Sequence, residues 1–287
     1  MDIREAEKIT DTGSLRLDTK GIAPYIVCKD FELPGILHGF STRLGGVSTG
    51  IYESMNLGIR LDDEREHVIE NYRRLGESMG FDYRRLSLPD QVHETNILAV
   101  TEEDAGDGIM NAGAHHRIDA QITNVRNLPL IAYAADCVPI LLADPVAGAV
   151  GSVHAGWRGS VSGIAAKTVA AMVSEYGCRP GDIHAVIGPS IGPDSYEVDD
   201  PVINAVKECA YIGDTEKDRV FRPVPDNEGK YMLDLWSLNE EILIKAGLPR
   251  GNIYKTGLCT LKHHDLFFSH RYTQGRRGLN GSVIMLK

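Results

Sequence analysis

LPLIAYAADCVPILLADPVAGAVGSVHAGWRG, residues 128–159, determines how the centre of the chain folds. It contains two runs typical of β-strands, 138–143 and 149–153, separated by the turn-forming sequence Asp-Pro-Val-Ala-Gly. These features predict an antiparallel hairpin. Downstream, VSGIAAKTVAAMVSEYG (161–177) has apolar residues at helical spacing and ends in Gly177. The second strand is therefore expected to lead through a Gly-rich segment into a helix.

The position of the turn sets which residues of the hairpin face each other. If the turn is centred on Pro145 and Val146, Cys137 lies directly opposite His154. Facing Cβ atoms about 4.5–5.5 Å apart can bring a thiolate and an imidazole to one Zn²⁺, whose bonds to sulfur and nitrogen are about 2.3 and 2.0 Å long. Pro139 inside the first strand predicts an edge or a bulge, because proline cannot donate a ladder hydrogen bond.

The rest of the chain mixes helices and strands without a regular βαβ alternation. The first third is typical of short strands and turns. Helical patterns follow at 62–80, 201–210 and 233–247, and strand patterns at 183–192, 252–260, 266–272 and 280–287. No internal repeat or low-complexity linker divides the sequence. We therefore predict a single α+β domain with a mixed, largely antiparallel sheet or sandwich flanked by helices.

Composition narrows the class of protein. With 287 residues, of which 43% are hydrophobic, the chain can bury a large core. Its formal net charge of −10 disfavours binding to a nucleic-acid backbone, so a small-molecule partner is expected. No window approaches the roughly 18 continuous apolar residues of a membrane span, and the N-terminus has no leader-like apolar segment. We therefore expect a cytoplasmic protein that binds neither nucleic acid nor membranes.

The five cysteines are scattered and never form a CxxC pair, which argues against a disulfide framework or a zinc ribbon. Two interpretations of Cys137 and His154 stay open. In the first, Cys137 is a nucleophile, His154 is its base, and Asp136 or Asp119 orients the histidine. In the second, Cys137 and His154 are two of the three protein ligands of a catalytic zinc, which keeps its fourth position open for water or substrate.

His93, in QVHETNI (91–97), is the best candidate for the third ligand. Gln91 and Asn96 would supply polar groups around the metal, and the segment is expected to form the adjacent strand. Of the other histidines, His38 and His270 could line a pocket, whereas the pairs 115–116 and 263–264 are typical of solvated loops. The sequence contains no HxH pair, which disfavours a multicopper cluster, and it lacks the P-C-x-x-C pattern of cytidine-type deaminases.

Seven blocks occur in order along the chain: HGFSTRLGGVSTGIYESMNLG, QVHETNI, DAQIT, ADCVPILLADP, VHAGWRGSVSGI, IGPSIG and FFSHRY. Together they resemble the YfiH/LACC1 family, once labelled polyphenol oxidase or laccase-domain proteins. The resemblance covers residues 35–287 and implies one catalytic domain there. Residues 1–34 lie outside it, and we expect them to form an N-terminal extension of packed strands.

The resemblance implies a compact sandwich related in shape to bacterial toxin deamidases of the CNF1 type. It also implies one zinc ion, held by His93, Cys137 and His154. It does not imply an oligomeric state. The implied activity is phosphorolysis of purine nucleosides (adenosine, inosine, guanosine and methylthioadenosine), with a separate deamination of adenosine. In the deamination, zinc would lower the pKa of its water towards about 7 for attack on the purine C6, with Asp119 or Asp136 as the acid.

Phosphorolysis also requires a site for phosphate, and arginine suits it because the guanidinium is permanently charged and binds oxyanions in a bidentate manner. We nominate Arg43, Arg158 and Arg271, which lie within or beside the motif blocks. Three alternatives compete with a zinc nucleoside phosphorylase. They are a metal-free Cys–His hydrolase or amidase acting on cell-wall precursors, a copper-dependent polyphenol oxidase, and a non-catalytic module that keeps zinc only for folding.

Overall fold

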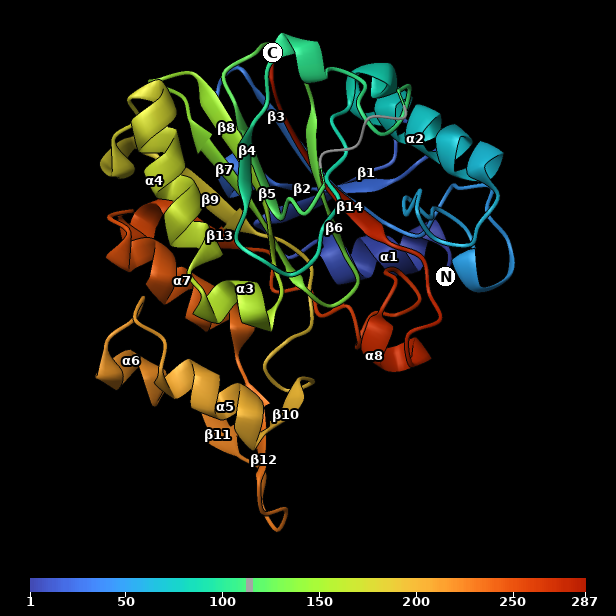
Figure 1. Ribbon diagram of the computed structural model, residues 1–287. Helices are drawn as coiled ribbons and strands as arrows, with labels where there is room; N and C mark the ends of the chain where they lie inside the picture. The colour runs from blue at the N-terminus through green and yellow to red at the C-terminus, as the bar shows by residue number, and fades with distance from the viewer. Residues whose placement is uncertain (112–115) are drawn as a thin grey trace.

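Two β-sheets packed face to face form the centre of the protein (Figure 1), a computed structural model that describes residues 1–111 and 116–287. The mixed, six-stranded sheet has the order β13 (Ile253–Lys255), β9 (His184–Ile187), β7 (Val138–Asp144), β8 (Ala149–Ala155), β5 (Ala120–Thr123) and β4 (Ile97–Ala99). The antiparallel, five-stranded sheet has the order β1 (Leu15–Asp18), β2 (Tyr25–Cys28), β3 (Ile36–Ser41), β14 (Asn280–Leu286) and β6 (Leu130–Ala134).

Helices cover the outer faces of the two sheets, as Figure 1 shows. Two of them, α4 (Ile164–Tyr176) and α7 (Leu235–Lys245), pack on the six-stranded sheet, and α2 (Arg65–Met79) packs on the five-stranded sheet. The predicted single α+β domain with flanking helices is therefore confirmed. None of the helices in the described part of the chain combines the length and apolar character needed to cross a membrane.

A smaller layer projects from one end of the sandwich (Figure 1, bottom). It contains a three-stranded sheet in the order β10 (Glu197–Asp199), β12 (Lys230–Leu233) and β11 (Phe221–Pro223), together with α5 (Asp200–Lys207) and α6 (Asp214–Lys217). The short helices α3 (Trp157–Val161) and α8 (His270–Thr273) also lie towards this end. Loops gathered at this end of the sandwich carry most of the predicted site residues.

The predicted hairpin is β7–β8, and every residue of both strands is buried. Side chains alternate between two apolar layers: Ile140 and Leu142 face the helices, whereas Leu141 and Ala143 face the other sheet. Both faces of a central strand are thus covered, which explains why the sequence is continuously apolar instead of alternating with polar residues.

The register of the hairpin differs from the prediction by two residues. His154 pairs with Pro139, and Cys137 precedes the strand. The turn is centred one residue later than expected, because the Asp144 carboxylate accepts hydrogen bonds from the backbone N–H groups of Val146 (2.9 Å) and Ala147 (2.8 Å). Gly148 then adopts φ +67°, a conformation that glycine tolerates without strain.

Two further strand predictions were wrong. Pro139 lies in a central strand and not at an edge, since β7 has β8 on one side and β9 on the other. The ladder to β9 ends at Ile140, and next to it the carbonyl oxygen of Pro139 accepts from the backbone N–H of Gly188 (2.8 Å), so the proline lies where this ladder stops. The segment 266–272, predicted as a strand, instead forms turns that lead into α8, where the Ser269 hydroxyl caps the helix by accepting from the backbone N–H of Tyr272.

Residues 1–34 contain a helix, α1 (Ile3–Thr10), before β1 and β2. The strands were expected, but the helix was not. Strand β2 pairs with β3, so this segment adds two strands to the five-stranded sheet. The division into an extension (1–34) and a catalytic domain (35–287) stays a prediction.

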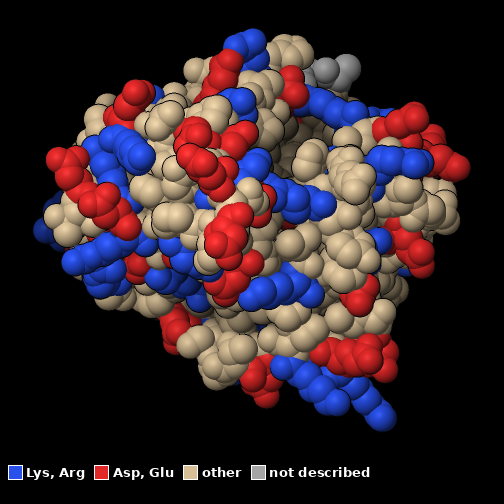
Figure 2. Space-filling view, turned by 90° about the horizontal axis from the view of Figure 1, so that it is seen from below, with Lys and Arg blue, Asp and Glu red and all other residues tan. Residues whose placement is uncertain are grey.

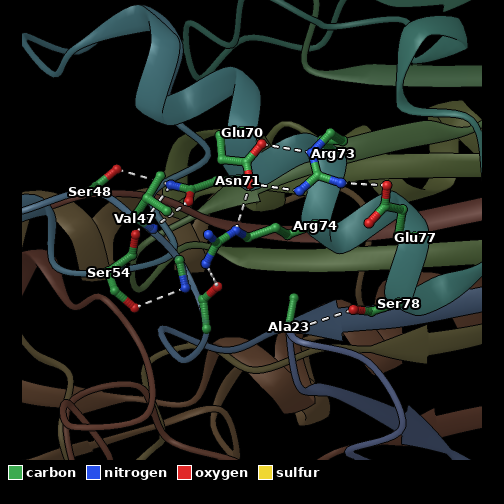
Figure 3. Close-up of polar contacts among 12 residues, drawn as sticks. Ala23, Val47, Ser48, Ser54, Glu70, Asn71, Arg73, Arg74, Glu77 and Ser78 are labelled. Atoms are coloured by element: carbon green, nitrogen blue, oxygen red, sulfur yellow. Dashed lines mark hydrogen bonds and ion pairs between the residues drawn. The ribbon is translucent and has the colours of Figure 1, made fainter.

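A buried asparagine on α2 fixes the Gly-rich loop that follows β3 (Figure 3). The side chain of Asn71 accepts from the backbone N–H of Val47 (2.8 Å) and donates to the Ser48 hydroxyl and to the carbonyl oxygens of Ser54 and Asn56. The loop in turn ends at Gly58, which lines a cavity beside the candidate site described below. Helix α2 therefore supports one wall of that cavity.

We predict that Asn71→Ala lowers the free energy of unfolding by about 3 kcal/mol, because several buried backbone groups lose their only hydrogen-bonding side chain. Urea titration followed by circular dichroism measures this. The matched control is Arg73→Ala on the same helix, which removes only solvent-exposed ion pairs and should leave stability close to that of the wild type. Equal stability of the two variants would contradict a stabilising role for the hydrogen bonds between Asn71 and the loop.

A second prediction concerns His38 in β3, which is buried and accepts a hydrogen bond from the backbone N–H of Cys28 (3.1 Å). Burial lowers its pKa from 6.5 to about 4. The unfolded chain therefore binds a proton before the folded chain does, so stability present above the unfolded pKa of 6.5 is lost as the pH falls towards 4. The free energy of unfolding that His38 contributes, and that is lost over this pH range, should reach about 3 kcal/mol.

The measurement is the free energy of unfolding across this pH range for wild type, His38→Gln and the exposed-site control His116→Gln. The curve of His38→Gln should be flatter by the amount stated, whereas that of His116→Gln should follow the wild type. Parallel curves for wild type and His38→Gln would refute the assignment.

Candidate metal centre and adjoining cavities

Three segments that are distant in sequence meet at one end of the sandwich. His93 lies in the loop before β4, Cys137 immediately precedes β7, and His154 is the penultimate residue of β8. One ligand atom from each residue lies within 4.8 Å of the other two. His154 is buried, Cys137 is partly exposed and His93 is exposed, so the group opens to solvent on one side. We call these residues the His–Cys–His triad.

The buried carboxylate of Asp119, just before β5, holds the triad in place. It accepts a hydrogen bond from Nδ1 of His154 (2.8 Å) and from the backbone N–H groups of Val92 (3.2 Å), His93 (2.9 Å) and Glu94 (2.8 Å). Three successive N–H groups thus form a concave anion site, which accounts for the left-handed backbone of His93 at φ +64°. With Nδ1 bound to Asp119, the Nε2 atom of His154 is left to face Cys137.

The charges of the triad favour a thiolate. Burial alone would raise the pKa of Cys137, but the neighbouring His154 and His93 lower it to about 6. Burial would likewise lower the pKa of His154, but Cys137 and Asp119 raise it to about 9. Asp119 is itself buried, yet its hydrogen bonds from His154 and the loop lower the pKa of the carboxyl. Cys137, His154 and Asp119 therefore stabilise one another in their charged forms.

A glycine permits the close approach of the three segments. Gly156 follows β8 and lies against the triad. A Cβ atom at this position would lie 2.7 Å from Cδ2 of His93 and 3.2 Å from Sγ of Cys137. Both distances are shorter than an ordinary van der Waals contact, so any larger residue would push the loop of His93 outwards.

The donor set fits zinc. A tetrahedral zinc with bonds of about 2.3 Å to sulfur and 2.05 Å to nitrogen separates those two ligand atoms by about 3.6 Å. Sγ of Cys137 and Nε2 of His93 are 3.6 Å apart. A carboxylate on the outer nitrogen of a ligand histidine, as Asp119 provides for His154, is typical of metal centres. Three protein donors leave one coordination position free, as in catalytic rather than structural zinc sites.

Two cavities adjoin the triad and share a wall. The first, about 180 Å³, has a mostly apolar lining that includes Ile59, Leu61, Leu88, Tyr133 and Leu279; we call it the apolar cavity. The second, about 370 Å³, is lined by Asp136, Trp157, Tyr196, His270 and three arginines; we call it the arginine cavity. Both are lined by His93, Ala135, Cys137 and Arg277.

The surface seen from below is hollowed, and Lys and Arg side chains lie along part of the border of the hollow (Figure 2). Elsewhere on this face acidic and basic side chains are interspersed. On this face of an acidic protein, positive charge is therefore concentrated along part of the border of the hollow.

The predicted arginines divide into two groups. Arg158 and Arg271 line the arginine cavity, where the first lies over the Trp157 ring and the second over the Tyr196 ring. Arg43 lines neither cavity. Its guanidinium donates to the carbonyl oxygens of Glu53 and His264, so it ties two loops together instead of facing the triad.

Arg277, between α8 and β14, is a site residue that the sequence analysis missed. It lines both cavities and is half-buried, and burial lowers the pKa of its guanidinium. The sequence did carry a signal: Arg277 precedes a glycine in QGRRGLNG, just as Arg158 does in GWRG. The same criterion that nominated Arg158 would have found it.

Asp136 lines the arginine cavity, with φ +88°. Its carboxylate accepts from the Thr260 hydroxyl (2.6 Å) and from the backbone N–H of Arg271 (2.6 Å). It thus fixes the start of α8 against the residue that precedes Cys137. Asp119, by contrast, lies behind the triad with its side chain fully buried.

The remaining predictions around the triad have mixed outcomes. The segment of His93 does not form the adjacent strand; it is a loop, and β4 begins only at Ile97. Gln91 bonds to the backbone of Tyr133 at both its amide atoms, so it anchors the loop. His270 lines the arginine cavity, whereas His38 lines a separate cavity with Arg16 and Lys287. His115 lies outside the described residues.

Comparison with known proteins shows the family of the chain. A family model described as multi-copper polyphenol oxidoreductase laccase matches residues 37–287. The chain belongs to this family. Among its relatives, purine nucleoside phosphorylase YlmD of Bacillus subtilis is 36% identical over 256 residues, which are 88% of this chain and 89% of that protein. The human purine nucleoside phosphorylase LACC1 is 34% identical over 93% of this chain and 56% of its own length.

Solved structures show the same fold. The Bacillus licheniformis hypothetical protein YfiH superposes with a TM-score of 0.89 at 36% identity, covering 95% of this chain and 99% of its own. YlmD from Geobacillus stearothermophilus has a TM-score of 0.87 at 34% identity, with coverage of 96% and 99%. The resemblance to the YfiH/LACC1 family found in the sequence is therefore confirmed.

We predict that Asp119→Asn weakens Zn²⁺ binding by about 10–100-fold. The amide keeps one acceptor oxygen for His154 and His93, but its NH₂ group replaces Oδ2, which accepts from Val92 and Glu94, and the negative charge beside His154 is lost. Competition with a chromophoric chelator measures the affinity, and circular dichroism checks that the variant is folded. The control is Glu94→Gln, which changes an adjacent carboxylate whose partner is the exposed Arg117. A folded Asp119→Asn with wild-type Zn²⁺ affinity would rule out this role.

Proposed function

We propose that this protein is a zinc-dependent purine nucleoside phosphorylase that accepts adenosine, inosine, guanosine and methylthioadenosine and also deaminates adenosine. The observation that carries the proposal is an open His–Cys–His triad between an apolar cavity and an arginine cavity. Relatives that match 88% of this chain are named purine nucleoside phosphorylase, which supports the same activity here. Absence of nucleic-acid binding and a cytoplasmic location remain predictions.

His93, Cys137 and His154 would hold the zinc, which would supply Lewis acidity at its open position. Zinc suits this site better than several copper ions. Within residues 1–111 and 116–287, the triad is the one group of three His, Cys, Asp or Glu side chains close enough to bind a metal. A multicopper oxidase needs several such groups, so the family's copper label is not the basis of this proposal.

The two cavities match the two parts of a phosphorolysis. A purine ring is flat and largely apolar, and it suits the apolar cavity, where Tyr133 and Leu279 are available for packing. Phosphate suits the arginine cavity, where Arg158 and Arg271 supply charge. In the reaction a phosphate oxygen forms a bond to C1′ as the bond from C1′ to N9 breaks. The electron pair leaves with the purine, which takes up a proton.

In the deamination, water adds at C6 of adenosine and ammonia leaves, giving inosine. We assign positioning roles to both carboxylates. Asp119 accepts four hydrogen bonds and orients His154 and the His93 loop, and Asp136 fixes the backbone of Arg271. Each carboxylate is engaged as an acceptor at both oxygens, which favours these roles over the proton donation expected from the sequence.

A second candidate is a metal-free cysteine hydrolase or amidase. It is favoured by one specific observation: His154 lies between Asp119 and Cys137, the order of a Cys–His–Asp arrangement in which the carboxylate orients the base. That reading needs neither the arginine cavity nor His93. It predicts activity in protein freed of metal.

The test is chromatography of products from adenosine, with and without phosphate, using zinc-loaded protein. We predict phosphate-dependent release of adenine together with phosphate-independent formation of inosine. Both should fall by about 100-fold or more in Cys137→Ala, because a ligand of the metal is lost. Chelator treatment should have the same effect and added Zn²⁺ should reverse it, whereas Cu²⁺ with a phenol substrate should give no turnover.

Cys178→Ala is the control, since this cysteine is buried away from the triad beside Asp144. It should retain both activities. If zinc-loaded wild type yields no purine base from any of the four nucleosides, the proposal fails. Activity on an amide substrate that survives chelation and disappears in Cys137→Ala would establish the hydrolase instead.

A further inference from the structure

Arg277 has an unusual environment for an arginine. It lines both cavities, and its Nε atom is buried without a hydrogen-bond partner among the described residues. Cys137 and Asp136 act on its guanidinium through their charge and not through a hydrogen bond. A buried N–H donor without a partner costs free energy, so the fold keeps this group available at an energetic cost.

The neighbouring charged groups already have other partners. The carboxylate of Asp136 faces the same cavity, but its two oxygens accept from Thr260 and from the backbone of Arg271. Arg271 donates to the carbonyl oxygen of Glu197 (3.0 Å) and lies over an aromatic ring, as Arg158 does. The lining of the arginine cavity thus contains three arginines and one carboxylate, and among the arginines Arg277 is the one on the shared wall.

The geometry of phosphorolysis places the reacting carbon at the wall that the two cavities share. The C1′ atom is bonded to the purine and is attacked by phosphate, so it must lie between the site of the base and the site of the phosphate. Four residues line both cavities, namely His93, Ala135, Cys137 and Arg277. Two of them belong to the triad and one is an alanine. Arg277 is the member of this set that carries a permanent positive charge.

We propose that Arg277 binds the phosphate nucleophile at the junction of the two cavities and directs its oxygen towards C1′. This inference rests on the proposed function. The guanidinium would donate terminal N–H groups to two phosphate oxygens, in the bidentate geometry that arginine forms with oxyanions. Arg158 and Arg271 would bind the phosphate from the far side of the arginine cavity.

Phosphorolysis and deamination should depend on Arg277 to different extents. Deamination takes place at C6 of the purine and consumes water, so it does not need bound phosphate. Loss of Arg277 should therefore impair phosphorolysis far more than deamination. A purely structural role would lower both activities and the metal content together.

The experiment compares zinc-loaded wild type, Arg277→Gln, Arg277→Lys and the control Arg276→Gln, whose side chain is an exposed neighbour that lines neither cavity. Initial rates with inosine at varied phosphate give the KM for phosphate, and titration calorimetry with inorganic phosphate alone gives its Kd. We expect Arg277→Gln to raise both constants by about tenfold or more, because a charge-assisted bidentate contact is lost. Arg277→Lys should recover part of the loss, and Arg276→Gln should match the wild type.

Zinc content and adenosine deamination serve as readouts of the intact site, and in Arg277→Gln both should stay within about threefold of wild type. If wild type is phosphate-dependent but Arg277→Gln keeps its KM and Kd for phosphate, the inference fails and the proposed function stands. If wild type releases no base, the proposed function fails, and calorimetry still decides whether Arg277 binds phosphate. Equal loss of zinc, deamination and phosphate binding in Arg277→Gln would assign it a structural role and overturn the inference.

Discussion

The hydrogen bonds to the Asp119 carboxylate are the constraint on which the site depends. One buried anion joins the loop of His93 to the end of β8. Removing an anion from water is costly unless it is fully hydrogen-bonded, and here three N–H groups and an imidazole provide that compensation. The same bonds hold the two histidine rings 4.8 Å apart, edge to face. A triad assembled from three distant segments therefore has a defined geometry before any ligand binds.

The sandwich explains why this geometry occurs at its end. The central strands of the sandwich are covered on both faces, so the site open to solvent forms where the strands stop. Cys137 lies just outside β7 and His154 lies one residue from the end of β8. The small layer of β10–β12 and the turn into α8 then add the walls of the arginine cavity through Tyr196 and Arg271. The packed sheets form a rigid scaffold, and the segments at the ends of the strands carry the candidate functional residues.

Features that depend on local sequence pattern were predicted correctly. Predictions were wrong where the structure depends on particular side-chain hydrogen bonds. The β7–β8 hairpin, helix α4 and strand β14 follow from apolar periodicity and turn residues, and the structure confirms them. The hairpin register was missed because the Asp144 carboxylate shifts the turn by one residue, an effect of two side-chain hydrogen bonds. The turn at 266–272 was missed because LFFSHRY has a strand-like composition, while Ser269 caps a short helix instead.

The same distinction applies to the site residues. His93, Cys137 and His154 could be nominated because the hairpin brings Cys137 and His154 together and the family resemblance implies all three as ligands. Arginines are harder to assign, since one guanidinium can bind either a ligand or a backbone carbonyl. Arg43 and Arg158 both lie in Gly-rich motifs, yet the first ties loops together and the second lines a cavity. Only the contacts of each guanidinium distinguish the two cases, and these contacts come from elements far away in sequence.

The position of the triad on a shared wall bears on how one site could serve two reactions. A purine nucleoside in the apolar cavity would present C1′ of its sugar and C6 of its base at different places along the wall, and the triad lines both cavities through His93 and Cys137. Phosphorolysis needs charge on the phosphate side of C1′, whereas deamination needs an activated water near C6. A change in how the nucleoside lies along the wall would exchange one reacting atom for the other without moving the protein groups. Under the proposed function, the arginines would bind phosphate on one side of this wall, and water would be the nucleophile where no phosphate is bound.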